Sequence, residues 1–109
     1  IIGGGPGGLT AGIYAKRAAM NAVLIEKGAP GGQIINSDEV ENYPGFEHIG
    51  GAELGMEFSQ HAGSYGLEVV GREVASIIPG AESHTVQLDN GTALKTHPVI
   101  LGTGGNPRK

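Results

Sequence analysis

The 109-residue sequence contains no cysteine, which excludes disulfides, thiolate chemistry and sulfur-ligated metal sites from these residues. A longer protein containing this chain could still have any of them elsewhere. Histidine is scarce as well, because only four are scattered along the chain, without the spacing of metal ligands. We therefore expect no metal site, and histidines that are solvated or hydrogen-bonded.

Long hydrophobic runs and blocks of one charge are also missing. Seven basic and eleven acidic residues give a net charge of −4, which disfavours binding to nucleic acid or to an anionic membrane surface. The chain has no run of about eighteen apolar residues and no charged-then-apolar leader. A soluble, cytoplasmic protein is expected.

The length of 109 residues allows one domain at most, with a modest core. The apolar pair Ile1-Ile2 has the character of the tail of a strand, and Arg108-Lys109 ends the chain without any closing signal. We therefore expect the chain to be a segment of a longer protein.

Glycine is abundant instead, with 21 residues, and three of them fall at Gly3-x-Gly5-x-x-Gly8, the spacing of the dinucleotide-binding fingerprint. Gly3 would permit a tight turn after a strand, Gly5 a close approach of a pyrophosphate, and Gly8 close packing of a helix on the sheet. Pro6 suits the first turn of that helix, whose N-terminal end favours an anion. Chance matches are easy in a glycine-rich chain. The motif therefore indicates a dinucleotide site only if a strand, a helix and an acidic partner surround it.

The alanine-rich sequence after the motif predicts a helix to about Met20, with Leu9, Ile13 and Met20 near one face. Asn21 suits its C-terminal end. Gly12 would destabilise an isolated helix by about 1 kcal/mol relative to Ala, so we expect it to pack closely against a strand.

The run from Ala22 to Glu26 is apolar without alternation, as in a strand buried on both faces of a parallel sheet. Together with Ile1-Ile2 and the helix, it predicts a βαβ unit. Glu26 lies 18 positions after Gly8, near the spacing of about 20 expected for the acid that accepts a hydrogen bond from a ribose hydroxyl. A carboxylate there also repels a 2′-phosphate. The alternative is a solvated charge at the end of a strand.

Residues 27–50 have few periodic apolar positions and are predicted to form a long loop. Within it, Gly31-Gly32-Gln33 offers backbone donors and an amide that suit the polar edge of a heterocycle or a ribityl chain. The stretch Asn42-Tyr43-Pro44-Gly45-Phe46 combines an amide, two aromatic rings and a turn, so it could either line a pocket or anchor the loop.

A second helix is predicted from Gly51 to a C-terminal cap at Gly66. Its core-facing positions recur at helical spacing: Leu54, Phe58, Ala62 and Tyr65. Short strands are predicted after it at residues 67–70, 74–78, 84–88 and 92–96, with a hairpin turn at Asp89-Asn90-Gly91. We expect these strands to form a small antiparallel layer that crosses over between two strands of the parallel sheet.

Residues 98–101 are predicted to form another buried strand, which leads into a glycine-rich turn at residues 102–105. Open α/β sheets bind ligands at the carboxyl ends of their strands, so this turn should approach the same ligand as the first glycine loop. The alternative is a plain flexible turn. The predicted fold class is α/β and Rossmann-like, with three layers that include a parallel sheet and a small antiparallel crossover layer.

Four motifs, in order and over essentially the whole chain, resemble the amino-terminal part of the FAD domain of thioredoxin reductases. The FAD fingerprint of that family is similar to IIGGGPGGLTAGIYAKRA, its flavin loop to APGGQI, its next motif to EVENYPGF, and the turn that leaves its first FAD segment to VILGTGGNPRK. The family often has Ala at the positions of Gly7 or Gly8 and Ala-Thr-Gly at Gly102-Thr103-Gly104. These smaller residues should not block FAD.

The resemblance implies a binding role for particular residues and no catalytic residue in this chain. The residues implied to hold the FAD pyrophosphate are Gly3, Gly5, Pro6, Gly7 and Gly8. Those implied for the adenosine are Glu26 at the ribose and Val74 through its backbone, and Lys27 is a further cofactor-binding residue. Those implied along the flavin end are Gly31, Gly32, Gln33, Ile34 and Asn42. The late turn, Gly102, Thr103 and Gly104, would close on the cofactor.

The resemblance further implies that residues 1–109 are the amino-terminal segment of one FAD-binding domain. An NADPH domain with a Cys-x-x-Cys pair and a closing FAD segment would follow, and electrons would pass from NADPH, or NADH, through FAD and the cysteines to thioredoxin. A homodimer is usual in the family. The enzyme alternatives are a ferredoxin NADP reductase of the thioredoxin-reductase type and the flavoprotein subunit of an alkyl hydroperoxide reductase. An alternative of another class is a non-catalytic module that binds NAD or ADP.

Overall fold

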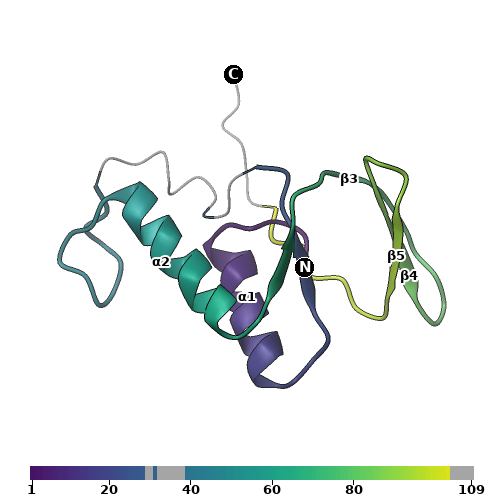
Figure 1. Ribbon diagram of the computed structural model, residues 1–109, viewed down its shortest axis with the longest axis horizontal. Helices are drawn as coiled ribbons and strands as arrows, with labels where there is room; N and C mark the ends of the chain where they lie inside the picture. Colours follow the sequence, from purple (N-terminus) through teal and green to yellow (C-terminus); the bar gives the residue numbers. More distant parts are fainter. Residues whose placement is uncertain (29–30, 32–38, 104–109) are drawn as a thin grey trace.

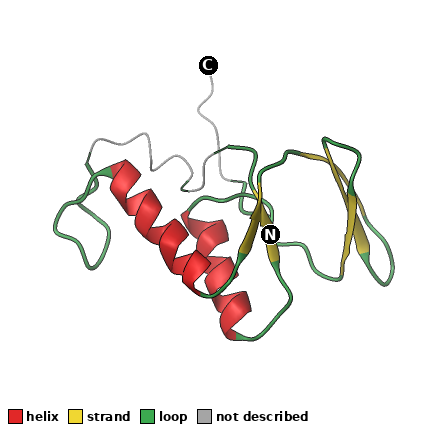
Figure 2. Ribbon diagram, viewed as in Figure 1, coloured by secondary structure: helices red, strands yellow, loops and turns green. Residues whose placement is uncertain are grey.

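The computed structural model describes residues 1–28, 31 and 39–103. The elements within them are α1 (Pro6–Arg17), β1 (Val23–Ile25), α2 (Gly51–Ser64), β2 (Glu68–Val70), β3 (Val74–Ile78), β4 (His84–Leu88) and β5 (Ala93–Thr96). α1 and α2 pack side by side on one face of the central parallel strands, and the antiparallel sheet of β3, β4 and β5 lies on the other side (Figures 1 and 2). The predicted three-layer α/β fold is confirmed.

Four chain segments run parallel at the centre of the molecule. β1 pairs in parallel with β2. On the other side of β1, Ile2 forms a parallel bridge to Ile25, and Leu101 forms one to Ile2. The Gly102 N–H donates to the Ile2 carbonyl at 2.7 Å. The order across the sheet is therefore the Leu101 segment, the Ile2 segment, β1 and β2, so the carboxyl ends of all four meet at one edge. The predicted βαβ unit is confirmed.

β1 is buried on both faces, as its unalternated apolar sequence predicts. One core lies between β1 and the helices and consists of Leu9, Leu24, Ala62 and Leu67. The other lies between the parallel strands and the antiparallel sheet and consists of Ile2, Ile25, Val86 and Leu88. Burying a leucine fully stabilises the fold by about 2 kcal/mol relative to leaving it exposed. The two cores hold the edge of the parallel strands in a fixed position.

α1 ends earlier than predicted. Ala19 adopts a φ of +58°, and the Met20 N–H donates to the Ala15 carbonyl at 3.0 Å while the Ala19 N–H donates to the Lys16 carbonyl at 3.0 Å. These two bonds form a Schellman motif, which normally has glycine at the left-handed position. Met20 is therefore half exposed instead of sharing the buried face of Leu9, and Asn21 is not the helix cap.

Gly12 packs closely, as expected, but its neighbour is the Leu67 side chain just before β2. A Cβ at Gly12 would collide with the Leu67 Cδ2 atom. Leu67 belongs to the core between β1 and the helices. The absent side chain thus lets α1 approach the segment that leads from α2 into β2.

α2 forms as predicted, with Leu54 and Ala62 buried and Phe58 half-buried. Tyr65 was expected in the core, and that expectation is wrong: it is the C-cap residue and is 43% exposed. The helix ends at Ser64 and Gly66 turns the chain with a φ of +80°, so Tyr65 lies beyond the last buried turn.

The short strands divide between two sheets. Residues 68–70 were expected in the antiparallel layer, but β2 pairs in parallel with β1. β3, β4 and β5 form the antiparallel sheet in that order. The predicted hairpin turn between β4 and β5 is confirmed, with Gly91 at a φ of +84°.

Residues 98–101 do not form the buried strand that their sequence predicts. Among the described residues Leu101 bridges to Ile2 alone, and the side chains of Ile100 and Leu101 are 46% and 65% exposed. These residues lie at the edge of the sheet with one neighbouring segment, and Leu101 lines an open cavity. Within the described residues, no helix has the length and apolar character needed to cross a bilayer.

Candidate functional site

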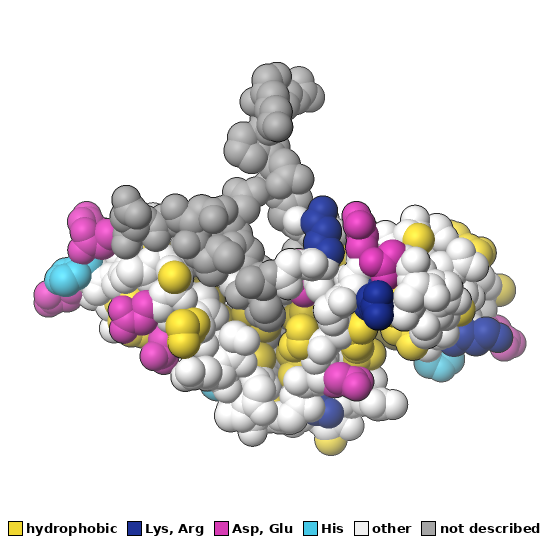
Figure 3. All heavy atoms as spheres, turned by 45° about the horizontal axis from the view of Figure 1, so that its top comes forward, with side chains coloured by type: hydrophobic (Ala, Val, Ile, Leu, Met, Phe, Trp, Pro, Cys, Tyr) yellow, Lys and Arg dark blue, Asp and Glu magenta, His cyan; other side chains and the backbone are white. Residues whose placement is uncertain are grey.

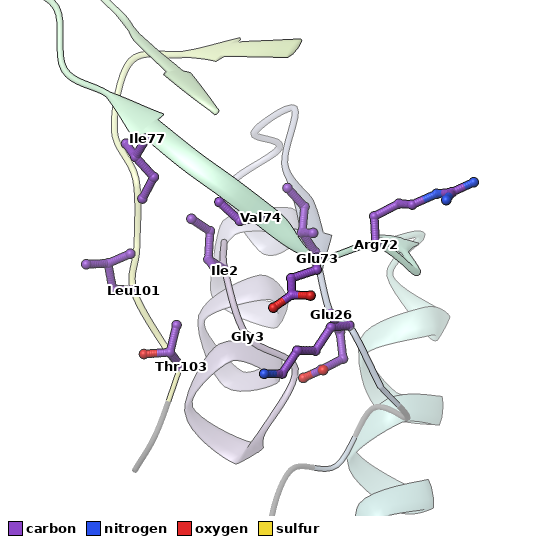
Figure 4. A pocket seen from close by; sticks show the side chains of 11 residues that line it. Ile2, Gly3, Glu26, Arg72, Glu73, Val74, Ile77, Leu101 and Thr103 are labelled. Atoms are coloured by element: carbon purple, nitrogen blue, oxygen red, sulfur yellow. The ribbon is translucent and has the colours of Figure 1, made fainter. Parts of the chain in front are cut away.

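A cavity of about 400 Å³ lies at the carboxyl edge of the parallel strands (Figure 4). The polar residues that line it come soon after the four parallel segments: Gly3, Glu26, Lys27, Arg72, Glu73 and Thr103. Its apolar walls are Ile2, Ile25, Val74, Ile77 and Leu101. Open α/β sheets bind their ligands at this edge. Figure 3 shows hydrophobic side chains gathered between the helices and the antiparallel sheet, with charged side chains beside them.

Two glycine turns meet backbone to backbone beside this cavity. Gly3 has a φ of +103°, and a Cβ there would collide with the carbonyl oxygen of Gly102. A Cβ on Gly8 would collide with the Gly3 carbonyl, and one on Gly102 would lie 3.3 Å from the Gly8 backbone. The tight turn at Gly3 and the close packing at Gly8 are therefore as predicted. The late turn lies against the first glycine loop and not apart from it.

The N-terminal end of α1 is built without acidic or capping side chains. Gly5 is the N-cap residue, Pro6 occupies the first turn, and no side chain of the described residues caps the helix. The first-turn N–H groups of a helix have no partner within the helix, and its dipole favours an anion there. A Cβ on Gly7 would meet no atom within 4 Å. This end of α1 is therefore suited to an external anion.

The Glu26 carboxylate is fixed at the edge of the cavity by two backbone groups. Its Oε1 accepts a hydrogen bond from the Gly4 N–H at 2.8 Å, and its Oε2 accepts one from the Gly28 N–H at 2.7 Å. Each carboxylate oxygen retains a lone pair for a further donor such as a ribose hydroxyl. Glu26 is thus oriented by the protein and is not simply a solvated charge at a strand end.

The predicted flavin loop touches the glycine loop at the one position that is described. The Gly31 N–H donates to the Gly4 carbonyl at 2.7 Å. The other predicted residues of that loop, Gly32, Gln33 and Ile34, lie outside the described residues, as does Gly104 in the late turn.

The loop before α2 is anchored by aromatic packing. The Tyr43 ring lies edge-on to Phe58 of α2, with centroids 5.1 Å apart, and 6.5 Å from the Phe46 ring. A Val40–Ile49 bridge closes the base of the loop. Asn42 is exposed and does not line the cavity, so the described contacts favour the anchoring interpretation of this stretch.

A sequence model of the family described as "Pyridine nucleotide-disulphide oxidoreductase" matches residues 1–109. The chain belongs to this family. Among curated members of the family with similar sequences, the thioredoxin reductase of Bacillus subtilis is 40% identical over 109 residues, which are all of this chain and 34% of that protein. The thioredoxin reductase of Listeria innocua is 41% identical with the same coverage. The chain therefore spans about a third of the length of these relatives.

One of the similar solved structures has nearly the same backbone as this chain. The crystal structure of Lactococcus lactis thioredoxin reductase matches with a TM-score of 0.95 and 38% identity, covering 99% of this chain and 35% of that one. The similarity to thioredoxin reductases predicted from the sequence motifs is confirmed.

Six residues that line the cavity were not predicted as site residues from the sequence: Ile2, Ile25, Arg72, Glu73, Ile77 and Leu101. Arg72 and Glu73 follow β2, and only the parallel pairing of β2 brings them to the carboxyl edge. The signal that could have found them is the predicted strand at residues 67–70, interpreted as a strand of the parallel sheet. No group of three potential metal ligands occurs in the part of the chain that the structure describes.

Proposed function

We propose that the chain is the amino-terminal segment of the FAD-binding domain of a thioredoxin reductase that uses NADPH. The observation that carries the proposal is the junction of Gly3, Gly8 and Gly102 beside the bare N-terminal end of α1 and the cavity. A dinucleotide needs such an approach of bare backbone to its pyrophosphate. The similarity to thioredoxin reductases over the full chain supports the same assignment.

The residues present fit the adenosine diphosphate half of FAD. The proposed pyrophosphate contacts are Gly3, Gly5, Pro6, Gly7 and Gly8. The adenosine would take its ribose contact from Glu26 with Lys27 beside it, and its adenine contact from the backbone of Val74. The flavin end would lie along Gly31, Gly32, Gln33, Ile34 and Asn42. The late turn, which consists of Gly102, Thr103 and Gly104, would close on the cofactor.

The chain's own contribution is to bind and orient the cofactor. The N–H groups at the start of α1 offset the pyrophosphate charge, and the fixed Glu26 carboxylate accepts from ribose. Ile77 and Leu101 give the cavity an apolar wall against which the adenine would pack. FAD supplies the redox chemistry when bound.

The remaining steps belong to a full-length protein. We propose that an NADPH domain with a Cys-x-x-Cys pair follows Lys109, and that a later segment completes the FAD domain. The cysteine pair would reduce thioredoxin, in a homodimeric and cytoplasmic enzyme. The chain spans about a third of its relatives, which is consistent with this division.

Purification of the full-length protein tests the proposal. We expect a yellow protein with stoichiometric FAD that reduces thioredoxin with NADPH. A colourless protein that binds NAD would reject the FAD assignment. A flavoprotein whose sequence after Lys109 lacks a Cys-x-x-Cys pair would retain FAD but reject thioredoxin as the acceptor.

A further inference from the structure

We propose that Glu73 determines specificity in the adenosine cavity: together with Glu26 it admits an adenosine with a free ribose 2′-hydroxyl and rejects one with a 2′-phosphate. This inference rests on the proposed function, because it assigns selectivity to the same cavity. It would keep the 2′-phosphorylated NADPH out of the flavin site of an enzyme that must bind both.

Glu73 is placed in the cavity by its own backbone. Its carbonyl accepts a hydrogen bond from the Asp89 N–H at 2.9 Å, which ties the start of β3 to the turn after β4. It stands between the end of β2 and Val74, the residue proposed to meet the adenine. Figure 4 shows its carboxylate directed into the cavity toward Gly3 and Glu26, whereas the Arg72 side chain points away.

The charges of the cavity favour a neutral ribose. The Glu26 carboxylate is fixed by backbone donors at 2.8 and 2.7 Å, so its negative charge stays at the cavity edge. The Arg72 Nη1 lies 3.9 Å from the Asp89 Oδ1, directed toward that carboxylate. Glu73 has no ion pair with any other described residue, and Lys27 is the remaining cation in the lining. Two carboxylates would thus act on a ribose bound here, against the Lys27 ammonium group and the Arg72 guanidinium, which points away from the cavity.

Adenosine ligands with a ribose 2′-hydroxyl and those with a 2′-phosphate differ in charge at the position where these carboxylates would act. Pyrophosphate is common to FAD and to NADPH and would bind at the start of α1 in both cases. Only a 2′-phosphate adds negative charge on the ribose between Glu26 and Glu73. A ribose hydroxyl instead donates a hydrogen bond to a carboxylate oxygen. The difference in affinity between the two ligands therefore isolates the effect of the cavity carboxylates.

Competition against FAD measures this difference in the full-length protein stripped of its flavin. ADP-ribose and 2′-phospho-ADP-ribose are titrated as competitors while FAD rebinding is followed by the loss of flavin fluorescence. Binding of either probe to an NADPH domain does not displace FAD and so does not contribute. We expect ADP-ribose to compete more strongly in the unaltered protein, and Glu73→Gln to reduce the ratio of the two inhibition constants by about 3- to 10-fold.

Glu68→Gln is the matched control, because Glu68 is exposed on β2 and does not line the cavity. It should leave the ratio unchanged. The role of Glu73 would be overturned if Glu73→Gln left the ratio of inhibition constants unchanged. It would also be overturned if Glu26→Gln alone abolished all discrimination between the two competitors. If the unaltered protein does not rebind FAD, the proposed function fails, which is a different result from rebinding without discrimination.

Discussion

The Glu26 carboxylate is hydrogen-bonded to Gly4, 22 residues earlier in the chain, through an Oε1 to N–H distance of 2.8 Å. This bond joins the residue after β1 to the glycine loop that precedes α1. The same carboxylate accepts from Gly28 through its other oxygen. A residue proposed to bind ribose therefore also fixes the shape of the loop proposed to bind pyrophosphate, before any ligand is present.

Glu26→Gln should lower the free energy of unfolding of the flavin-stripped protein by about 1 kcal/mol. An amide has one accepting atom where the carboxylate has two, so one backbone N–H would face an NH₂ group. Denaturant unfolding checks this, with Glu57→Gln on the exposed face of α2 as the control. Weaker FAD binding with unaltered stability would mean that Glu26 acts on the ligand alone.

Gly7 and Gly8 are adjacent in the fingerprint, yet alanine should have opposite effects at the two positions. Gly8→Ala should destabilise the protein by about 1–3 kcal/mol, because its Cβ collides with the Gly3 carbonyl and the backbone must shift. Gly7→Ala should stabilise it by about 0.5–1 kcal/mol, since the new Cβ meets open space within a helix. Thermal unfolding of both variants checks the pair, and equal effects would contradict the described packing.

Gly12 and Leu67 should be energetically coupled. Gly12→Ala gains helix propensity but overpacks against the buried Leu67 side chain, so we expect a net loss of about 1 kcal/mol. Leu67→Ala removes the colliding Cδ2 atom, and the double variant should therefore be more stable than the sum of the single losses predicts. Unfolding measurements on the four proteins of the cycle test this.

Gly63→Ala is the control for that cycle. Gly63 lies in α2, and its added Cβ would meet no atom within 4 Å. This variant should gain about 0.5–1 kcal/mol of stability. Strict additivity between Gly12→Ala and Leu67→Ala would show that the two residues do not share the contact described.

Local signals in the sequence predicted the elements well. The glycine spacing, the apolar run of β1 and the Asp89-Asn90-Gly91 turn each specify a conformation within a few residues, and each is confirmed. The position of Glu26 beside the glycine loop also follows from the βαβ unit. The end of α1 was missed because a left-handed alanine, Ala19, occupies a position where glycine would have signalled the Schellman motif.

Features that depend on contacts between distant segments could not be predicted in the same way. β2 has only three residues, Glu68–Val70, and their sequence does not specify a parallel partner, so the pairing with β1 was not predicted. Arg72 and Glu73 enter the cavity only because of that pairing. The exposure of Leu101 follows from its place at the sheet edge, which its apolar sequence does not reveal.

The flavin content of a Gly5→Val variant tests whether the glycine loop binds the FAD pyrophosphate. Gly5 has φ −74° and ψ −174°, an extended conformation that valine can adopt, and the valine side chain should block a pyrophosphate from the backbone. The full-length protein and a Gly63→Ala control are purified in parallel, and folding is checked by circular dichroism.

We expect the unaltered protein and the control to show the absorption bands of oxidised flavin at stoichiometric occupancy. The Gly5→Val variant should be folded and colourless. Full flavin occupancy in a folded Gly5→Val variant would contradict the assignment of the glycine loop as the pyrophosphate site.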